Sequence, residues 1–319
     1  MSEKISVGIS SCLLGEKVRY DGGHKLDHYL KDTLGLYVTW VPVCPEVETG
    51  LPVPREAMRL VSTGTGSGPR LVTIKTGIDL TDRMQQWAER RLKELDKADL
   101  CGFIFKSRSP SSGMRGVKVY DRSSGVPSHS GVGIFARAFM DRFPFIPVED
   151  DGRLHDPALR ENFIERIFVF KRWKEMKRQG GSIKELIAFH TDHKLLILAH
   201  SPKHYTMLGR LVADAKKLDR ERLHNEYLTT LMDGLKLVAT TKKNTNVLQH
   251  VAGYFKKQLS AEERRELLEV IETYHKGLVP LIAPIVLANH YVRKYDEQYL
   301  KRQYYLHAHP AELMLRNHV

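Results

Sequence analysis

Cysteine is scarce in this chain, which has only Cys12, Cys44 and Cys101 among its 319 residues. So few cysteines argue against a disulfide framework and leave a metal site, a redox role or simple burial. There is no Cys-x-x-Cys pair, so cysteine spacing alone is only a weak indication of a metal. There is also no Gly-x-Ser-x-Gly motif, which disfavours a serine hydrolase.

Long apolar runs are missing as well. No segment approaches the roughly 18 to 20 apolar residues that a membrane span needs. The first residues, MSEKISVGIS, show no basic and then apolar leader. We therefore expect a cytoplasmic protein with no membrane partner. The chain is 42% hydrophobic and 28% charged, which is typical of a globular protein, and its length suits two domains.

Positive charge is concentrated in the second half. Residues 1–150 hold 21 Lys and Arg against 18 Asp and Glu, and the remaining residues hold 29 against 20. Basic side chains interleaved with aromatic rings suit RNA or DNA, because lysines neutralise phosphates while rings stack on bases. Solvated helix faces are the alternative. The residues concerned are Lys242, Lys243, Tyr254, Lys256, Lys257, Lys294, Tyr295, Lys301, Arg302, Tyr304, Tyr305 and Arg316.

The first half alternates strand-like and helical segments. This pattern predicts an α/β domain with a mostly parallel sheet and helices on both faces. A flexible STGTGSG segment, residues 62–68, separates two of the strands. The expected strands are 5–9, 37–43, 58–62, 71–75, 100–105 and 117–120, and the expected helices are 24–34, 79–96 and 132–141.

The second half has the apolar spacing of helices almost throughout, which predicts an all-α helical bundle. The expected helices are 163–178, 183–199, 204–215, 222–237, 247–257, 261–276 and 280–292. Residues 144–157 look like a linker. We expect an α/β domain over 1–148, a linker and connecting helix over 149–182, and a helical domain over 183–319.

Most of the candidate site residues lie in three loops at the ends of predicted strands: 9–25, 44–55 and 106–116. Because the carboxyl ends of parallel strands meet at one edge of a sheet, we expect these loops to converge. Cys12 and Cys44 occupy similar positions in two of them, which suggests one shared site. Thiolates suit iron–sulfur clusters and zinc, while buried thiols are the alternative. The first two of these loops are also rich in ionisable residues, which indicates either a reactive site or a solvated surface. These residues are Arg19, Asp21, His24, Lys25, Glu46 and Arg55.

Four stretches of the first half closely resemble the thiouracil desulfidase family, formerly a domain of unknown function. They are SSCLLGEKVRYDGGHK, CPEVETGLPVPREAMRL, GFIFKSRSPSSGMRGVKVY and GVGIFARAF, and the match covers about residues 4–148. The resemblance implies an α/β domain in which three cysteines hold a [4Fe-4S] cluster and one iron has no protein ligand. It implies removal of sulfur from a small thiolated pyrimidine base or nucleoside, free or within RNA, by water.

Carried over by position, the resemblance makes Cys12 and Cys44 cluster ligands, Glu46 the acid/base group and Ser109 a polar residue near the substrate. For Glu46, a salt bridge to Arg55 or Arg19 is the alternative. The residues expected to contact substrate are Arg19, Tyr20, Asp21, His24, Lys25, Arg55 and Ser111.

One position departs from the family. The family usually reads Ser-Pro-Ser-Cys-Gly where this chain has Ser109-Pro110-Ser111-Ser112-Gly113, so Ser112 stands where the third thiolate ligand is expected. A hydroxyl is a hard, weakly acidic donor, so the cluster is labile, differently ligated or absent. Cys101 lies at the start of a strand and is expected to be a buried thiol, not a replacement ligand. Loss of the cluster would leave a non-catalytic nucleic-acid-binding or regulatory protein.

From about His190, the second half resembles the YbgA-like domain, which implies no reaction. The motifs are FHTDHKLLILAHSPKHYTMLGRLVA, NTNVLQHVAGYFKKQLS and YLKRQYYLHAHPAELMLRN. His190, His193, His200 and His204 have the helical spacing of metal ligands, but no acidic ligand joins them except Asp192, which favours hydrogen-bonded or surface histidines. Pro202 is expected to break the helix between the last two.

Overall fold

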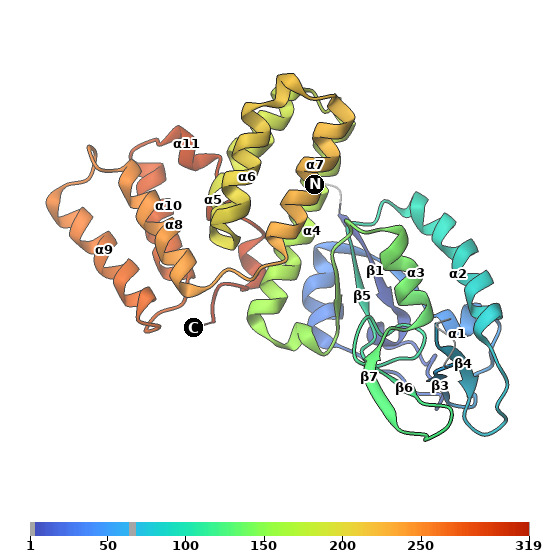
Figure 1. Cartoon of the computed structure of the whole chain (residues 1–319). Coiled ribbons are helices and arrows are strands. Elements are labelled where there is room, and N and C mark those ends of the chain that lie inside the picture. Colours follow the sequence, from blue (N-terminus) through green and yellow to red (C-terminus); the bar gives the residue numbers. More distant parts are fainter. Residues whose placement is uncertain (1–3, 64–67, 319) are drawn as a thin grey trace. The chain divides into compact units, whose positions relative to one another are not determined.

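The computed structural model describes residues 4–63 and 68–318 and divides into two compact units, Met1–His155 and Asp156–Val319 (Figure 1). Most of the glycine-rich segment expected between two strands lies outside the described residues. No described helix is both long and apolar enough to cross a membrane.

A four-stranded parallel sheet forms the centre of the first unit, in the order β2-β1-β5-β8. Its strands are β1 (Ile5–Ser10), β2 (Val38–Val43), β5 (Gly102–Phe105) and β8 (Val148–Asp150). The predicted α/β architecture with a mostly parallel sheet is therefore confirmed. Strand β8 was not anticipated, because its three residues lie in the segment that read as a linker.

A second four-stranded sheet has the order β4-β3-β6-β7. Its strands are β3 (Met58–Val61), β4 (Arg70–Thr73), β6 (Val117–Tyr120) and β7 (Pro127–Gly131). β3 and β4, the two strands expected on either side of the glycine-rich segment, pair in the antiparallel direction, while β3 and β6 run parallel. That these strands form a separate sheet was not predicted. They are only partly buried, as expected of a sheet with one face in solvent.

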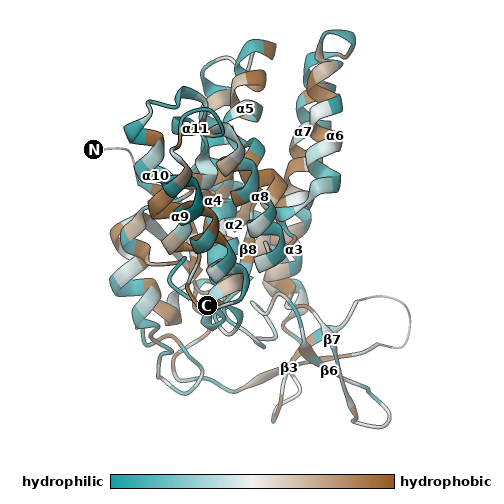
Figure 2. Ribbon diagram, turned by 90° about the vertical axis from the view of Figure 1, so that its left-hand side faces the viewer, coloured by the Kyte–Doolittle hydropathy of each residue, from teal (hydrophilic) through white to brown (hydrophobic). Residues whose placement is uncertain are grey.

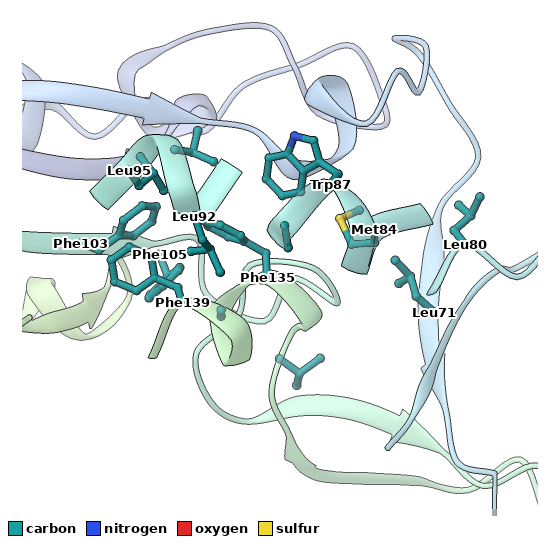
Figure 3. Packing of buried hydrophobic residues seen from close by; sticks show 14 of the residues in the cluster. Leu71, Leu80, Met84, Trp87, Leu92, Leu95, Phe103, Phe105, Phe135 and Phe139 are labelled. Atoms are coloured by element: carbon teal, nitrogen blue, oxygen red, sulfur yellow. The ribbon is translucent and has the colours of Figure 1, made fainter. Parts of the chain in front are cut away.

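Helices α2 (Thr81–Leu95) and α3 (Ile134–Arg142) pack on one face of the parallel sheet. Residues at alternate positions of a strand share a face, so Phe103 and Phe105 of β5 both meet α3, against Phe135 and Phe139 (Figure 3). Gly8 in β1 is required here, because a Cβ atom would lie 2.2 Å from the Phe103 ring. Aromatic packing of this kind fixes the strands that lead into the site.

On the opposite face, short turns replace a regular helix. The π-helical turn η2 (Tyr29–Thr33) and the 3-10 turn η3 (Leu34–Leu36) bury Leu30 and Leu34. A helix predicted over 24–34 therefore begins about five residues later than expected. The backbone N–H groups of Lys25 and Asp27 instead donate to the carbonyls of Cys12 and Leu13, which ties this stretch to the first cysteine loop.

The second unit is helical, as predicted. Its helices are α4 (Pro157–Arg178), α5 (Ile183–His200), α6 (Pro202–Ala213), α7 (Arg220–Leu235), α8 (Thr241–Tyr254), α9 (Ala261–His275), α10 (Ile282–Lys294) and α11 (Gln298–Lys301). Side-chain caps set several starts: Asp156 accepts from the N–H groups of Ala158 and Leu159, and Ser182 and Glu185 form a capping box. Helices such as α6 and α7 show both hydrophobic and hydrophilic residues along their length (Figure 2), as expected for helices with one buried face.

Candidate active site

Three loops that follow neighbouring strands line one cavity of about 350 Å³. After β1 comes the 3-10 turn η1 (Ser11–Leu14), after β2 the helical turn α1 (Pro45–Glu48), and after β5 the loop 106–113. Because β2, β1 and β5 are adjacent and parallel, their carboxyl ends bring these loops together, as the strand order predicts. Cys12 and Cys44 both line this cavity.

The two cysteine side chains are buried and lie in a polar surrounding. Burial raises the pKa of the Cys12 thiol to about 11; the Lys106 ammonium opposes this rise and the Glu46 carboxylate adds to it. Burial, and then the charge of Glu46, raise the pKa of Cys44 to about 12. Without a metal, both sulfurs are therefore protonated at neutral pH. A metal centre that bound them would release two protons.

Glu46 is the carboxylate of the cavity. It lies in the first turn of α1, two residues after Cys44, whose Sγ is 3.5 Å from Glu46 Oε2. Its other oxygen, Oε1, accepts a short hydrogen bond from the Ser111 hydroxyl. Arg55 Nη2 is 3.8 Å from Glu46 Oε2, which is longer than the roughly 3.2 Å limit of an N–H···O hydrogen bond. The salt bridge to Arg55, which was the alternative for Glu46, is thus only a loose ion pair.

Hydroxyl groups connect Glu46 to the third loop. Ser111 Oγ lies 2.9 Å from Ser109 Oγ and 3.4 Å from Ser112 Oγ. Ser109 Oγ also accepts from the backbone N–H of Ser112 at 3.1 Å, so the turn is held from within. Ser112 lines the cavity with the two cysteines, whereas Ser111 is fully buried behind it. Glu46 is therefore fixed by a hydroxyl whose own position is set by this turn.

The start of α3 supports the same turn. The backbone N–H groups of Phe135 and Ala136 donate to the Ser111 carbonyl at 2.9 and 3.3 Å. Gly133 precedes the helix, and a Cβ atom there would lie 2.5 Å from the carbonyl carbon and oxygen of Ser111. Only glycine allows this close approach of the helix start to the loop.

Lys106 and Asp151 are site residues that the sequence did not reveal. Lys106 lines the cavity, and its Nζ lies 2.8 Å from both Asp151 Oδ2 and Ser107 Oγ. Burial alone would raise the pKa of the Asp151 carboxyl, but hydrogen bonds from Lys106 and Ser107 hold this pKa below its ordinary value. The sequence offered one indication for Lys106, which directly follows a predicted buried strand. It offered none for Asp151, because this residue follows β8, a strand that was not predicted.

Of the residues expected to contact substrate, Arg19, Tyr20 and Arg55 line the cavity. Asp21, His24 and Lys25 are exposed and lie outside its lining. Asp21 accepts two hydrogen bonds from Arg19, and this holds the pKa of its carboxyl below the usual range. The three are therefore better described as surface residues of the first loop.

Cys101 is buried at the opposite end of the sheet. Its backbone N–H donates to the carbonyl of Ser6, near the start of β1, whereas Cys12 follows the end of that strand. Cys101 Sγ lies 3.7 Å from the carbonyl of Asp99. As expected, it is a buried thiol, and it lies away from the cavity that Cys12 and Cys44 line.

A groove rich in basic side chains adjoins the cavity, and we call it the basic groove. It shares Lys106 and Arg108 with the cavity. Its other charged or aromatic members are Arg59, Arg115, Lys118, Tyr120, His129, Asp150 and Arg153. The Arg59 guanidinium lies 5.2 Å from the centre of the Tyr120 ring, a cation–π contact.

The four histidines singled out in the second unit have protein partners. His190 Nδ1 lies 3.0 Å from Tyr227 Oη, and His193 Nδ1 lies 2.7 Å from the carbonyl of Phe189. His200 Nε2 is hydrogen-bonded to Glu165 Oε2, and His204 Nδ1 is hydrogen-bonded to Ser201 Oγ. His200 ends α5 and His204 lies in α6, because the helix is interrupted before Pro202, as predicted. They are hydrogen-bonded histidines of the fold, which was one of the two alternatives.

A second cavity, of about 340 Å³, lies inside the helical unit and contains a buried charge cluster. Arg316 donates through Nε to Glu161 at 3.0 Å and through Nη2 to Glu165 at 2.8 Å. Glu165 also accepts from His200, and these partners lower its pKa although burial alone would raise it. Burial and the nearby charge of Glu165 raise the pKa of Glu161. Two carboxylates from α4 thus hold the C-terminal segment.

The basic residues of the second unit, for which nucleic-acid binding and solvated helix faces were the alternatives, are largely paired within the protein. Arg316 is buried, and Lys294, Lys301 and Arg302 form ion pairs with Glu263, Asp296 and Asp192. Lys243 Nζ donates to the backbone carbonyls of His200 and Val238. Most of the basic residues chosen from the sequence are therefore used within the domain, so they do not support a phosphate-binding face.

Comparisons with known proteins agree with this two-part organisation. A family model described as 2-thiouracil desulfurase matches residues 7–151, and one described as protein of unknown function (DUF1722) matches residues 194–310. The uncharacterized protein YbgA of Escherichia coli (strain K12) is 33% identical over 158 residues, which cover 49% of this chain and 94% of YbgA. The uncharacterized protein YbbK of Bacillus subtilis (strain 168) is 29% identical over 109 residues, covering 33% of this chain and 71% of YbbK.

A solved structure of the [4Fe-4S]-dependent thiouracil desulfidase TudS is 32% identical, with a TM-score of 0.40, and the match covers 49% of this chain and 97% of TudS. Both resemblances drawn from the sequence motifs are confirmed by the two family matches. The chain belongs to the family of YbgA, and it joins a 2-thiouracil desulfurase domain to a YbgA-like helical domain.

Proposed function

We propose that this protein is a desulfidase that replaces the thiocarbonyl sulfur of a pyrimidine by oxygen. The observation that carries the proposal is the convergence of Cys12, Cys44, Glu46 and Ser112 on one cavity. The match of residues 7–151 to the 2-thiouracil desulfurase model supports the reaction class. The same match does not favour the alternative, a non-catalytic protein that has lost its site.

The donor set of the cavity fits an iron–sulfur cluster in part. Cys12 and Cys44 supply two thiolates, the soft ligands that such clusters prefer, and Ser112 supplies an oxygen as the third donor. We assign a [4Fe-4S] cluster to these three residues. When bound, the cluster would supply an open iron coordination position that attracts sulfur as a Lewis acid.

Glu46 is placed to move protons. Overall, C=S and H2O become C=O and H2S: water supplies the oxygen, and its two protons leave with the sulfur. Ser111 donates to Glu46 Oε1, so the lone pairs of Oε2 are directed to the cavity, where Arg55 is only a loose partner. In this proposal, Glu46 takes a proton from the attacking water and returns it to the leaving sulfur. Such acid–base assistance typically accounts for about 10²- to 10⁴-fold in rate.

The basic groove supports a substrate whose pyrimidine is attached to phosphates, such as a thiolated nucleotide within RNA. Lys106 and Arg108 belong to both the groove and the cavity, so a base in the cavity would leave its backbone beside Arg115 and Lys118. The support for RNA comes from this groove in the first unit, not from the helical unit. Phosphate contacts of this kind weaken as salt concentration rises.

The proposal is tested by purifying the full chain without oxygen and measuring iron, acid-labile sulfide and release of hydrogen sulfide from 2-thiouracil and from thiolated RNA. We expect iron and sulfide in the wild type, loss of both in Cys12→Ser and Cys44→Ser, and unchanged iron content in Cys101→Ser. Glu46→Gln should keep iron but lose at least about 10²-fold in rate. Iron-free protein, or iron-loaded protein that releases no sulfide from either substrate, would refute the proposal.

A further inference from the structure

Arg55 is a buried cation whose hydrogen-bonding capacity is largely unused. Its side chain is 7% exposed, and its Nε, which is buried, has no hydrogen-bond partner within residues 4–63 and 68–318. Nη1 reaches the carbonyl of Pro52 only at 3.5 Å, and Nη2 is 3.8 Å from Glu46 Oε2. Burying a guanidinium with such long contacts is costly unless another group accepts its N–H bonds.

The other cations of the cavity differ from Arg55. Arg19 donates to Asp21 at 3.2 and 3.0 Å, and Lys106 Nζ is 2.8 Å from Asp151 Oδ2. Both therefore have carboxylate partners at hydrogen-bonding distance, whereas Arg108 is exposed to solvent. Arg55 is held in place by its backbone, since its N–H donates to the carbonyl of Tyr20 at 2.8 Å. A fixed, buried donor that faces a cavity indicates a ligand with an acceptor.

Glu46 and Arg55 together present an acceptor and a donor side by side. The carboxylate accepts an N–H at one lone pair of Oε2 and keeps the other for the proton of the attacking water, and the guanidinium donates to an oxygen or sulfur on the neighbouring ring carbon. This pattern is complementary to the ring N3–H and adjacent C=O or C=S of a uracil-type base. We propose that Glu46 and Arg55 recognise this N3–H/carbonyl edge, which makes Arg55 a specificity-determining residue. The inference rests on the proposed function for the identity of the ring.

Methylated bases test the edge without any variant. 1-Methyluracil keeps N3–H and carries its methyl where a nucleoside carries ribose, whereas 1,3-dimethyluracil lacks both N1–H and N3–H. We expect the full chain, free of cluster, to bind 1-methyluracil at least about 10-fold more tightly than 1,3-dimethyluracil in a ligand-observed NMR titration, since a hydrogen bond to a charged group is lost with the dimethyl base. Equal affinities would overturn the proposal.

Variants assign the preference to Arg55. Arg55→Gln should weaken binding of 1-methyluracil by about 10- to 100-fold and leave 1,3-dimethyluracil nearly unchanged. Arg55→Lys should restore part of the loss, whereas Arg142→Gln, at an exposed cation paired with Asp96 outside the cavity lining, should keep the preference. A preference that survives in a folded Arg55→Gln protein would overturn the assignment. These ligands contain no sulfur, so a preference without desulfidase activity would refute the proposed function and leave this inference standing.

Discussion

Replacing Arg316 by methionine should strongly destabilise the helical unit. The guanidinium donates to Glu161 at 3.0 Å, to Glu165 at 2.8 Å and to the carbonyl of Tyr305 at 2.6 Å, and its side chain is 5% exposed. Methionine fills a similar volume but leaves two buried carboxylates without their shared cation. Removing one partner of a buried ion pair typically costs about 3–5 kcal/mol of unfolding free energy. We expect a loss in that range at pH 8.

The loss should depend on pH with a defined sign. Burial and the charge of Glu165 already raise the pKa of Glu161 in the wild type. Without Arg316, the folded-state pKa values of both carboxyl groups rise, and that of Glu161 moves further above its unfolded value. Such groups destabilise the folded state as pH rises through the folded pKa. The penalty should therefore be smaller at pH 5, where protonation removes the buried charge, than at pH 8.

The measurement is urea unfolding followed by far-ultraviolet circular dichroism, with hydrogen–deuterium exchange to locate the change in the helical unit. Arg302→Met is the matched control, because Arg302 pairs with Asp192 at a site where its side chain is 58% exposed. Exposed ion pairs contribute less than about 1 kcal/mol. A loss below 1 kcal/mol in Arg316→Met, or one equal at pH 5 and pH 8, would show that the cluster does not hold the C-terminal segment.

Three further outcomes are expected. Ser112→Cys should raise the iron retained after anaerobic gel filtration relative to wild type, because a thiolate replaces a hard oxygen donor; retention equal to that of Ser112→Ala would contradict the assigned ligand. Gly133→Ala should cost about 1–3 kcal/mol, because its Cβ meets the Ser111 backbone, whereas Gly209→Ala, in open space on α6, should be neutral or slightly stabilising. Burial lowers the pKa of His190 to about 4. As pH falls, the unfolded state is therefore protonated at this histidine before the folded state, and about 3 kcal/mol of stability should be lost between pH 6.5 and pH 4. His190→Gln should reduce this dependence of stability on pH, measured by urea unfolding.

The sequence predicted what depends on local pattern. Alternating strands and helices placed the loops of Cys12, Cys44 and Ser112 at one edge of a parallel sheet, and the cavity lies there. It did not predict β8, because three residues ending in Glu149 and Asp150 show no strand periodicity. Nor did it find Lys106 and Asp151, whose pairing depends on that strand.

Long-range pairing explains the other differences. Arg316 read as part of a basic surface, but its partners Glu161 and Glu165 lie more than 150 residues earlier in the chain. No local pattern could indicate that this charge is neutralised inside the fold. Charged residues in a loop sequence likewise do not show which side chains point into a cavity and which point to solvent. Arg19 and Arg55, which line the cavity, therefore looked the same in the sequence as His24 and Lys25, which do not.

The last strand of the parallel sheet limits where the chain can be cut. A truncated protein ending at residue 148 would retain both cavity cysteines, yet it would lack most of β8 and the Asp151 carboxylate that holds Lys106 beside Cys12. One ending at His155 would keep them. Whether the first unit can be expressed by itself should therefore depend on residues 149–155, seven residues that lie beyond the boundary expected from the motifs.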